Sequence, residues 1–361
     1  MAITAADVKN LREMTGAGMM DCKKALTATD GDIEKAVQFL KEKGLATAQK
    51  KAGRIAAEGK VVATVSADAK TAVILEVNIE TDFAANTDKF KEYIEALAAQ
   101  ILAGDYADLD AFLNADSAIN PGTTVADTHK SKIAEIGENM TIRRFEKITT
   151  DGMIVPYIHA GGKIGVVVAA EGDTSDAAKE ALANLAMQIA AMNPLYITRD
   201  EMSQEQLKQE ESDTILSALN DPFTLPKPIL QGLFAKALDG VWGAEDAAAY
   251  EAEKNNKYLP NFISAEGKAQ LAALAVADKE AIEQNKIFAG LVAGRVAKRL
   301  KDICLLDQTY VKAEDGKQSV AAYIASVNKD LKLVKMVRFE TGEGIEKKEE
   351  NFAEEVAKQM Q

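Results

Sequence analysis

The chain contains one pattern twice, in which two strand-like runs flank a short turn and a helix follows. In the first copy, KVVATVS and TAVILEVN flank Ala67-Asp68-Ala69-Lys70. In the second, GMIVPYIH and KIGVVVAA flank Ala160-Gly161-Gly162. Apolar runs of this length on either side of turn residues predict antiparallel hairpins. The repeat therefore indicates an α+β fold whose core has two related subdomains, each an antiparallel sheet with a helix.

The helices of the two copies also resemble each other. The first carries Leu97-Ala98-Ala99-Gln100-Ile101 and the second carries Leu185-Ala186-Met187-Gln188-Ile189. If Asn78 and Glu171 are equivalent strand ends, the connection to this motif is 19 residues long in the first copy and 14 in the second. The additional residues of the first copy fall in the segment Glu80-Thr81-Asp82-Phe83-Ala84-Ala85-Asn86, which we call the surplus loop. Because surface loops often carry function, this loop is a candidate site.

Helical periodicity dominates the amino-terminal region and a long internal segment. Residues 1–45 contain three short apolar series separated by turn residues, which predicts a three-helix bundle whose last helix ends at Gly44. Residues 46–59 are rich in Ala and are expected to form a linker that is at least partly helical. Four of the seven prolines and Trp242 lie between residues 222 and 260, inside a mostly helical insertion. We expect the insertion to pack a small core of its own, in preference to covering a partner, with apolar residues that include Phe223, Leu230, Phe234, Leu238, Trp242 and Phe262.

Near its end the chain returns to a strand pattern. The run LVKMVRFE echoes TIRRFEK at residues 141–147, so the insertion interrupts the second core subdomain. A polar helical pattern follows at residues 349–360. The predicted divisions are a bundle with its linker at 1–55, a first core subdomain at 56–140, a second core subdomain at 141–205 plus 296–345, a helical insertion at 206–295 and a carboxy-terminal helix at 346–361.

The composition argues against several functional classes. The chain has 56 acidic residues against 43 Lys and Arg, so a net charge of -13 gives no overall attraction to nucleic acid or anionic lipid. Two distant cysteines, Cys22 and Cys304, favour neither a disulfide framework nor a zinc cluster. The amino terminus has no signal-peptide pattern, and no stretch reaches membrane-spanning length. We expect a soluble, cytoplasmic protein.

The residue patterns of common enzymes are missing. The sequence has no phosphate-binding loop motif, no dinucleotide-binding glycine pattern, no HExxH and no CxxC pair. His129 and His159 are the only histidines, and neither has a nucleophile with a local signature beside it. We therefore expect no catalytic residue, no cofactor and no bound metal, and a protein as the partner.

Several segments resemble one known family. Residues 15–26, TGAGMMDCKKAL, resemble the amino-terminal signature of elongation factor Ts. The resemblance covers residues 1–205 and 286–361 and fades across the insertion. Further similar segments are Glu80-Thr81-Asp82-Phe83 in the surplus loop, Ile136-Gly137-Glu138-Asn139 with Ile142-Arg143-Arg144, Tyr157-Ile158-His159, and Arg338-Phe339-Glu340 with Gly342-Glu343-Gly344-Ile345-Glu346.

The resemblance implies a fold and an activity. It implies a ubiquitin-associated-like bundle, two related core subdomains and a helical, coiled-coil-like projection. It also implies a guanine-nucleotide exchange factor that binds elongation factor Tu in its GDP-bound and nucleotide-free forms. In the family, the bundle and first subdomain hold the partner's GTPase domain, and the second subdomain reaches a separate β-domain. By resemblance Thr81, Asp82, Phe83 and Ala84 form the wedge that disturbs the partner's magnesium site.

The same resemblance names further contact residues. Met19 and Met20 are expected to touch the GTPase domain, and adjacent helical residues point about 100° apart, so the two side chains cannot both be central in the bundle. Ile136, Gly137 and His159 are contact candidates on similarity alone.

Alternatives stay open at this point. Phe83 could be a core residue at the foot of a helix, and the protein could be a chaperone-like or adaptor scaffold without exchange activity. The family's wedge usually continues Val-Ala-Lys, whereas this chain has Ala84-Ala85-Asn86. Lys50, Lys51 and Arg54 favour a solvated face over direct contact with nucleic acid.

Overall fold

In the computed structural model, residues 3–346 are described, and they separate into two units. Unit 1 comprises residues 3–193 and 322–346, and unit 2 comprises residues 194–321. Among these residues the fold is mixed α+β, with helices at the amino terminus and two three-stranded antiparallel sheets. The carboxy-terminal helix predicted at residues 349–360 lies outside the described residues.

Three helices open unit 1: α1 (Ala5–Thr15), α2 (Met19–Ala28) and α3 (Ile33–Lys51). Thr4 starts α1 with a capping box, in which its hydroxyl accepts a hydrogen bond from the Asp7 amide and the Asp7 carboxylate accepts one from the Thr4 amide. The helices pack around Leu11, Cys22 and Leu26, all fully buried.

The prediction that the third helix ends at Gly44 is wrong. Gly44 keeps a right-handed backbone, and glycine closes a helix when it adopts the left-handed conformation. The helix continues because its extension packs on α7 (Val125–Ile136), and because Ala48 joins the apolar cluster of the first sheet. Tertiary burial therefore overrides the local propensity of glycine to stop a helix.

The first sheet has the order β1 (Glu58–Val65), β2 (Thr71–Ile79) and β3 (Met140–Thr149). Between β2 and β3 lie α4 (Asp82–Ala85), α5 (Asp88–Ala103), α6 (Leu109–Asn114) and α7. Strand β2 is buried on both faces: Leu75 and Val77 pack with α5, while Ile74 packs toward the second sheet. The first predicted hairpin is confirmed.

The second sheet has the order β4 (Met153–His159), β5 (Ile164–Glu171) and β6 (Lys332–Glu340), and α8 (Asp176–Met192) follows β5. Both sheets thus share one strand order, with a helix between the second and third strands. The pairing of Leu75 with Phe145 places β3 beside β2. Residues 141–149, which the sequence pattern assigns to the second subdomain, therefore lie in the first sheet.

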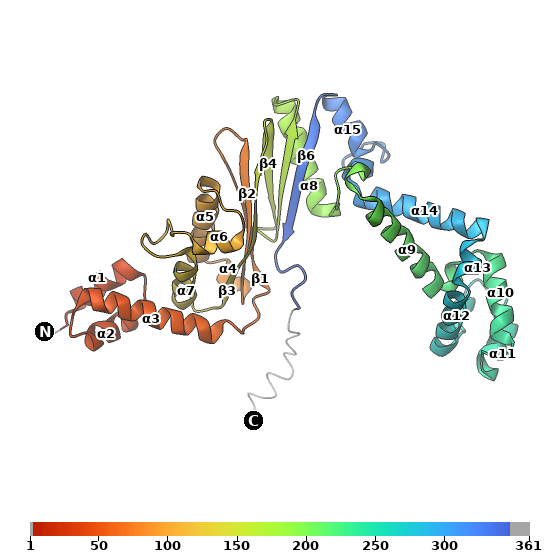
Figure 1. Cartoon of the computed structure of the whole chain (residues 1–361), viewed down its shortest axis with the longest axis horizontal. Helices are drawn as coiled ribbons and strands as arrows, with labels where there is room; N and C mark the ends of the chain where they lie inside the picture. The colour runs from red at the N-terminus through yellow and green to blue at the C-terminus, as the bar shows by residue number, and fades with distance from the viewer. Residues whose placement is uncertain (1–2, 347–361) are drawn as a thin grey trace. The chain divides into compact units, whose positions relative to one another are not determined.

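The two sheets pack face to face (Figure 1), with α5 to α7 covering the outer face of the first sheet. Their shared apolar cluster joins Val61 and Ile74 of the first sheet to Val167, Val337 and Phe339 of the second. Such packing is typical of sheets that each bury one apolar face.

A buried carboxylate, Glu76 on β2, also joins the sheets. Its oxygens accept hydrogen bonds from Arg143 Nη1 at 3.0 Å, from Arg144 Nε at 2.6 Å and from the Gly342 amide at 2.9 Å. The Arg144 guanidinium lies 4.2 Å from the centre of the Phe339 ring. The Ile142-Arg143-Arg144 segment and the closing segment after Phe339 therefore meet here and hold the core together.

Unit 2 is helical among its described residues. Helices α9 (Gln204–Asn220) and α14 (Lys286–Ile303) pack on each other, and the segment between them folds around Phe234, Trp242 and Leu271. The predicted separate core of the insertion is confirmed for Phe223, Leu230, Phe234 and Trp242, whereas Leu238 and Phe262, which were expected in it, are exposed. Its other elements are η1 (Arg199–Glu201), η2 (Pro222–Thr224), α10 (Lys227–Leu238), α11 (Ala244–Glu253), η3 (Leu259–Asn261), α12 (Ala265–Ala277), α13 (Lys279–Glu283), η4 (Leu305–Asp307) and α15 (Val320–Val327), the last crossing into unit 1.

Candidate functional site

The surplus loop presents Phe83 to solvent from the short helix α4. The Phe83 side chain is 81% exposed, whereas the neighbouring Ala84 and Ala85 are buried in the cluster that contains Phe90. One side of α4 is thus anchored in the core, and the phenyl ring leaves from the other side. The alternative that Phe83 is a core residue is wrong.

Hydrogen bonds hold the backbone of α4 in place. The Thr81 hydroxyl accepts from the Ala84 amide at 3.2 Å, and the Thr87 hydroxyl donates to the Ala84 carbonyl at 2.7 Å. Asn86 closes the turn, because its side-chain amide donates to the Asp82 carbonyl at 2.9 Å. The Ala-Ala-Asn sequence of this chain therefore packs and closes the loop without the branched and charged residues usual in the family.

A second segment, Ile136 to Asn139, lies against the start of this loop. Glu138 Oε2 accepts from the Thr81 amide at 2.9 Å, and Glu138 Oε1 accepts from the Thr81 hydroxyl at 2.8 Å. Ile136 ends α7 and is half-buried against the first sheet's apolar cluster, and Gly137 follows in the left-handed conformation with φ 93°. The structure thus brings Ile136 and Gly137 close to the Phe83 loop.

The end of α3 joins the same place. Lys51 Nζ donates to the Gly137 carbonyl, and Arg54 Nη1 lies 3.5 Å from Glu80 Oε2. Both cations therefore make surface contacts inside unit 1, and Arg54 remains exposed, as the sequence pattern predicts.

Three methionines of the bundle are exposed to solvent. Met19 and Met20 lie in the first turn of α2 and are 53% and 64% exposed. Met14, at the end of α1, is 60% exposed as well.

His159 lies at the turn between β4 and β5, on a different sheet from the Phe83 loop. It is exposed, and its Nδ1 is 2.9 Å from Tyr157 Oη. The turn is attached to the first sheet, because the Val61 amide donates to the Gly162 carbonyl at 2.7 Å. Partial burial lowers the pKa of nearby Lys60, whose Nζ donates to the Gly161 carbonyl.

The other histidine, His129, has a structural role. Its Nδ1 lies 2.7 Å from Tyr93 Oη and its Nε2 lies 2.9 Å from the Met140 carbonyl. Burial lowers the pKa of His129 to about 4, so the ring is neutral at pH 7. A neutral ring accepts from the Tyr93 hydroxyl and donates to the carbonyl, which joins α5, α7 and β3.

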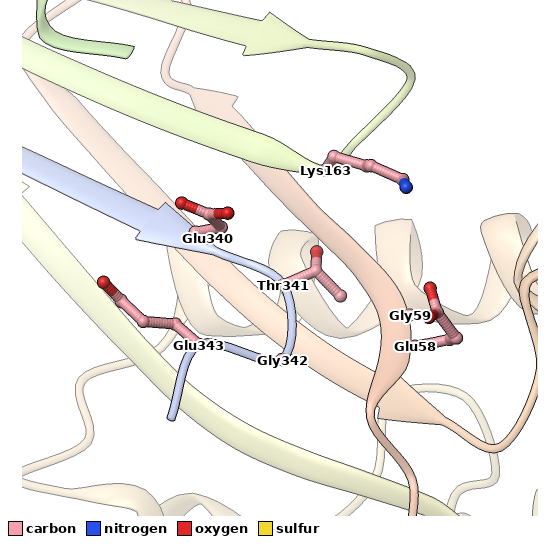
Figure 2. Close-up of a pocket in the computed structure, with 7 residues that line it drawn as sticks. All are labelled: Glu58, Gly59, Lys163, Glu340, Thr341, Gly342 and Glu343. Carbon is pink, nitrogen blue, oxygen red and sulfur yellow. The ribbon is translucent and has the colours of Figure 1, made fainter. Parts of the chain in front are cut away.

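A cavity of about 280 Å³ lies where β1 starts and β6 ends (Figure 2), lined by Glu58, Gly59, Lys163, Glu340, Thr341, Gly342 and Glu343. None of the candidate contact residues lines it. Within residues 3–346, no group of three or more His, Cys, Asp or Glu side chains is arranged to hold a metal ion. No helix in this range combines the length and apolar character needed to cross a bilayer.

Comparison with known proteins gives a full-length match. The sequence profile of the family described as Elongation factor TS matches residues 80–343. The chain is 42% identical to the elongation factor Ts of Clostridium novyi (strain NT) and 41% identical to that of Clostridioides difficile (strain 630), over 99% of this chain and 99% of each relative. The identity to that of Halothermothrix orenii is 37%, over 100% of this chain and 99% of the relative. These matches span residues 206–285, so the insertion is shared with the relatives, and the expected fading of the resemblance there is wrong.

Proposed function

The chain belongs to the elongation factor Ts family, and we propose how its residues perform the exchange reaction of that family. It is a nucleotide exchange factor for elongation factor Tu in translation elongation, it acts in the cytoplasm, and it is not an enzyme. We infer that the loop of Thr81, Asp82, Phe83 and Ala84 enters the partner as a wedge and disturbs its magnesium and phosphate site.

The observation that carries this proposal is an exposed aromatic ring on an anchored helix. Burying an 81% exposed phenyl ring in a partner yields a large gain in apolar contact. Because Ala84 and Ala85 are fixed in the core, little conformational freedom of the loop is lost on binding. Phe83 therefore has the properties of an interface anchor.

A wedge acts because the binding of GDP depends on geometry. GTPases hold the diphosphate with backbone amides, a lysine and a magnesium ion, so displacement of the chain beside the magnesium ligands weakens the nucleotide. The free energy of forming the factor–partner complex offsets the distortion. By linkage, a factor that weakens GDP binding is itself weakened by GDP to the same extent, so rebinding of nucleotide releases it. This chain supplies no covalent step.

We propose further contacts around the wedge. Met19 and Met20 present flexible thioethers that adapt to the partner's GTPase domain. Ile136 and Gly137 lie next to the Phe83 loop and extend the same surface. His159, on the second sheet, reaches the separate β-domain.

The finer architecture belongs to the same proposal. Helices α1 to α3 form a ubiquitin-associated-like bundle, and the two sheets with their helices are related subdomains. The shared strand order of the sheets supports this relationship. Helices α9 and α14 correspond to the coiled-coil-like projection.

The test is the release of a fluorescent GDP analogue from elongation factor Tu, measured with and without this protein. Acceleration at substoichiometric amounts, lost in a Phe83→Ala variant that still binds, supports the wedge. Binding without acceleration supports an adaptor scaffold instead. Acceleration that Phe83→Ala leaves unchanged means that another surface drives exchange.

A further inference from the structure

We propose that Glu138 is a positioning residue for the Phe83 loop: it fixes Thr81 so that α4 starts in one place and Phe83 leaves the surface in one direction. The inference rests on the proposed function, because it explains how this chain holds its wedge. Glu138 follows the contact candidates Ile136 and Gly137 but points its carboxylate back into the molecule, to Thr81.

The bonds between Glu138 and Thr81 begin where the backbone pairing of β2 with β3 ends. The last backbone pair is Ile79 with Met140. Beyond this pair, a side-chain carboxylate of each segment bonds a backbone amide of the other. Glu138 accepts from the Thr81 amide, and Glu80 Oε1 accepts from the Asn139 amide at 2.5 Å. Hydrogen bonds to an ionised acceptor are stronger than neutral ones, so these bonds hold two backbones that would otherwise separate.

The Thr81 hydroxyl transmits this constraint to α4. A hydroxyl has one proton, which here goes to Glu138 Oε1 at 2.8 Å. The hydroxyl oxygen can then accept a hydrogen bond from the Ala84 amide at 3.2 Å, and this bond caps the amino terminus of α4. Glu138 thus sets the orientation of the group that starts the helix carrying Phe83.

The same junction fixes the segment that follows α3. The Asn139 side-chain amide donates to the Arg54 carbonyl at 2.7 Å, and Arg54 in turn pairs with Glu80. The segments carrying Gly137 and Phe83 therefore sit in one hydrogen-bonded frame. Phe83 therefore has a fixed position relative to Gly137 when a partner binds.

A purely structural role for Glu138 makes a different prediction. In that case Glu138→Ala lowers stability and reduces exchange by the same factor whether or not Phe83 is present. A positioning role acts through Phe83, so the two substitutions are not additive. Glu135 offers a matched control, since it lies three residues before Glu138, at the end of α7, and pairs with Lys89 and Lys132 instead of the loop.

The experiment measures stimulated GDP-analogue release from elongation factor Tu at saturating factor, together with the half-saturating concentration. We expect Glu138→Ala to slow release roughly fivefold or more, because two charge-assisted bonds are lost at the loop. Glu138→Gln is expected to lose less, because its amide oxygen still accepts from the Thr81 amide. Glu135→Ala should stay within about twofold of the parent, and Glu138→Ala should add less than about twofold to Phe83→Ala.

Three outcomes overturn the proposal: parent-like release by Glu138→Ala, an equal loss in both backgrounds, or an equal loss for Glu135→Ala. If Phe83→Ala itself does not slow release, both the proposed wedge and this inference are wrong. If Phe83→Ala slows release but Glu138→Ala does not, only this inference is wrong. Circular dichroism checks folding. Should Glu138→Ala not fold, Thr81→Val removes both bonds of the hydroxyl, to Glu138 and to the Ala84 amide, keeps the amide bond to Glu138, and is expected to slow release in the same way.

Discussion

The Nε atom of Arg144 lies 2.6 Å from Oε2 of Glu76, a carboxylate with no exposed surface. A buried charge is tolerated when it is paired and fully hydrogen-bonded, and removal of one partner leaves it only partly compensated. Because Arg143 and the Gly342 amide bond the same carboxylate, β2, β3 and the turn after β6 depend on one ion cluster.

We predict that Arg144→Ala lowers the free energy of unfolding by about 3 kcal/mol, measured by urea denaturation. The matched control is Lys335→Ala, since Lys335 pairs with Glu146 across the same two sheets but at the surface. Its effect should be below about 1 kcal/mol. Equal losses in the free energy of unfolding for the two substitutions would mean that the burial of Glu76 does not determine how much the ion pair stabilises the fold.

We predict that Phe83→Ala leaves the fold intact and slows stimulated GDP release roughly tenfold or more at equal occupancy, equivalent to at least about 1.4 kcal/mol. The fold should persist because the ring is 81% exposed. Asp82→Ala should do less. Phe262→Ala, which removes an exposed ring from unit 2, serves as the control and should not change the rate. The wedge assignment is wrong if release by the Phe83 variant stays within twofold of the parent.

The sequence was sufficient for the parts of the fold that local patterns encode. Both hairpins follow from short apolar runs around turn residues, and the length difference between the two copies located the loop that exposes Phe83. Such signals depend on residues close together in the chain. They do not depend on knowing which distant segment covers them.

The parts that could not be predicted depend on distant contacts. In the structure β3 pairs with β2, with Leu75 opposite Phe145. The alternation of side chains along a strand does not specify which other strand it pairs with, so the sequence did not place β3 in the first sheet. Gly44 continues a helix because α7 covers it. The bonds from Thr81 to Glu138 join residues 57 positions apart, so neither motif predicts the other's role.

The half-buried His129 predicts how stability depends on pH. Its pKa is about 4 in the folded chain and near 6.5 when unfolded, so the unfolded chain binds more protons between these values. The contribution of His129 to stability is therefore present above about pH 6.5 and is lost as the pH falls toward 4. The stability difference between the parent and His129→Gln should shrink by about 1–2 kcal/mol from pH 7 to pH 5.

Urea denaturation at pH 7, 6 and 5 measures this change, with His159→Gln as the exposed control. A constant difference between the parent and His129→Gln across this range would contradict the assignment of a neutral ring with a lowered pKa. The comparison between variants is needed because the chain's many carboxylates also contribute to the pH dependence of the parent.

The last prediction is that most of unit 2 can be removed without loss of exchange. The pair of Arg299 with Glu210, at 3.4 Å, gives the register of α14 against α9, so residues 213 and 296 lie near one level of the two helices. Replacing residues 214–295 with a flexible linker of about six residues then spans the gap between neighbouring helices. The cut removes every buried residue of the distal core around Phe234 and keeps the cluster around Leu300 and Cys304.

Exchange should stay within about twofold of the parent, because Met19, Phe83, Gly137 and His159 all lie in unit 1. Circular dichroism and binding to elongation factor Tu are checked first, since stranded apolar residues on the shortened helices could cause aggregation. A cut at 212–284 would leave Phe288 and Val292 without the core that buries them, so it provides the poorly matched comparison. If the shortened protein folds and binds yet no longer accelerates GDP release, the exchange surface extends into unit 2, and the restriction of the contacts to unit 1 is wrong.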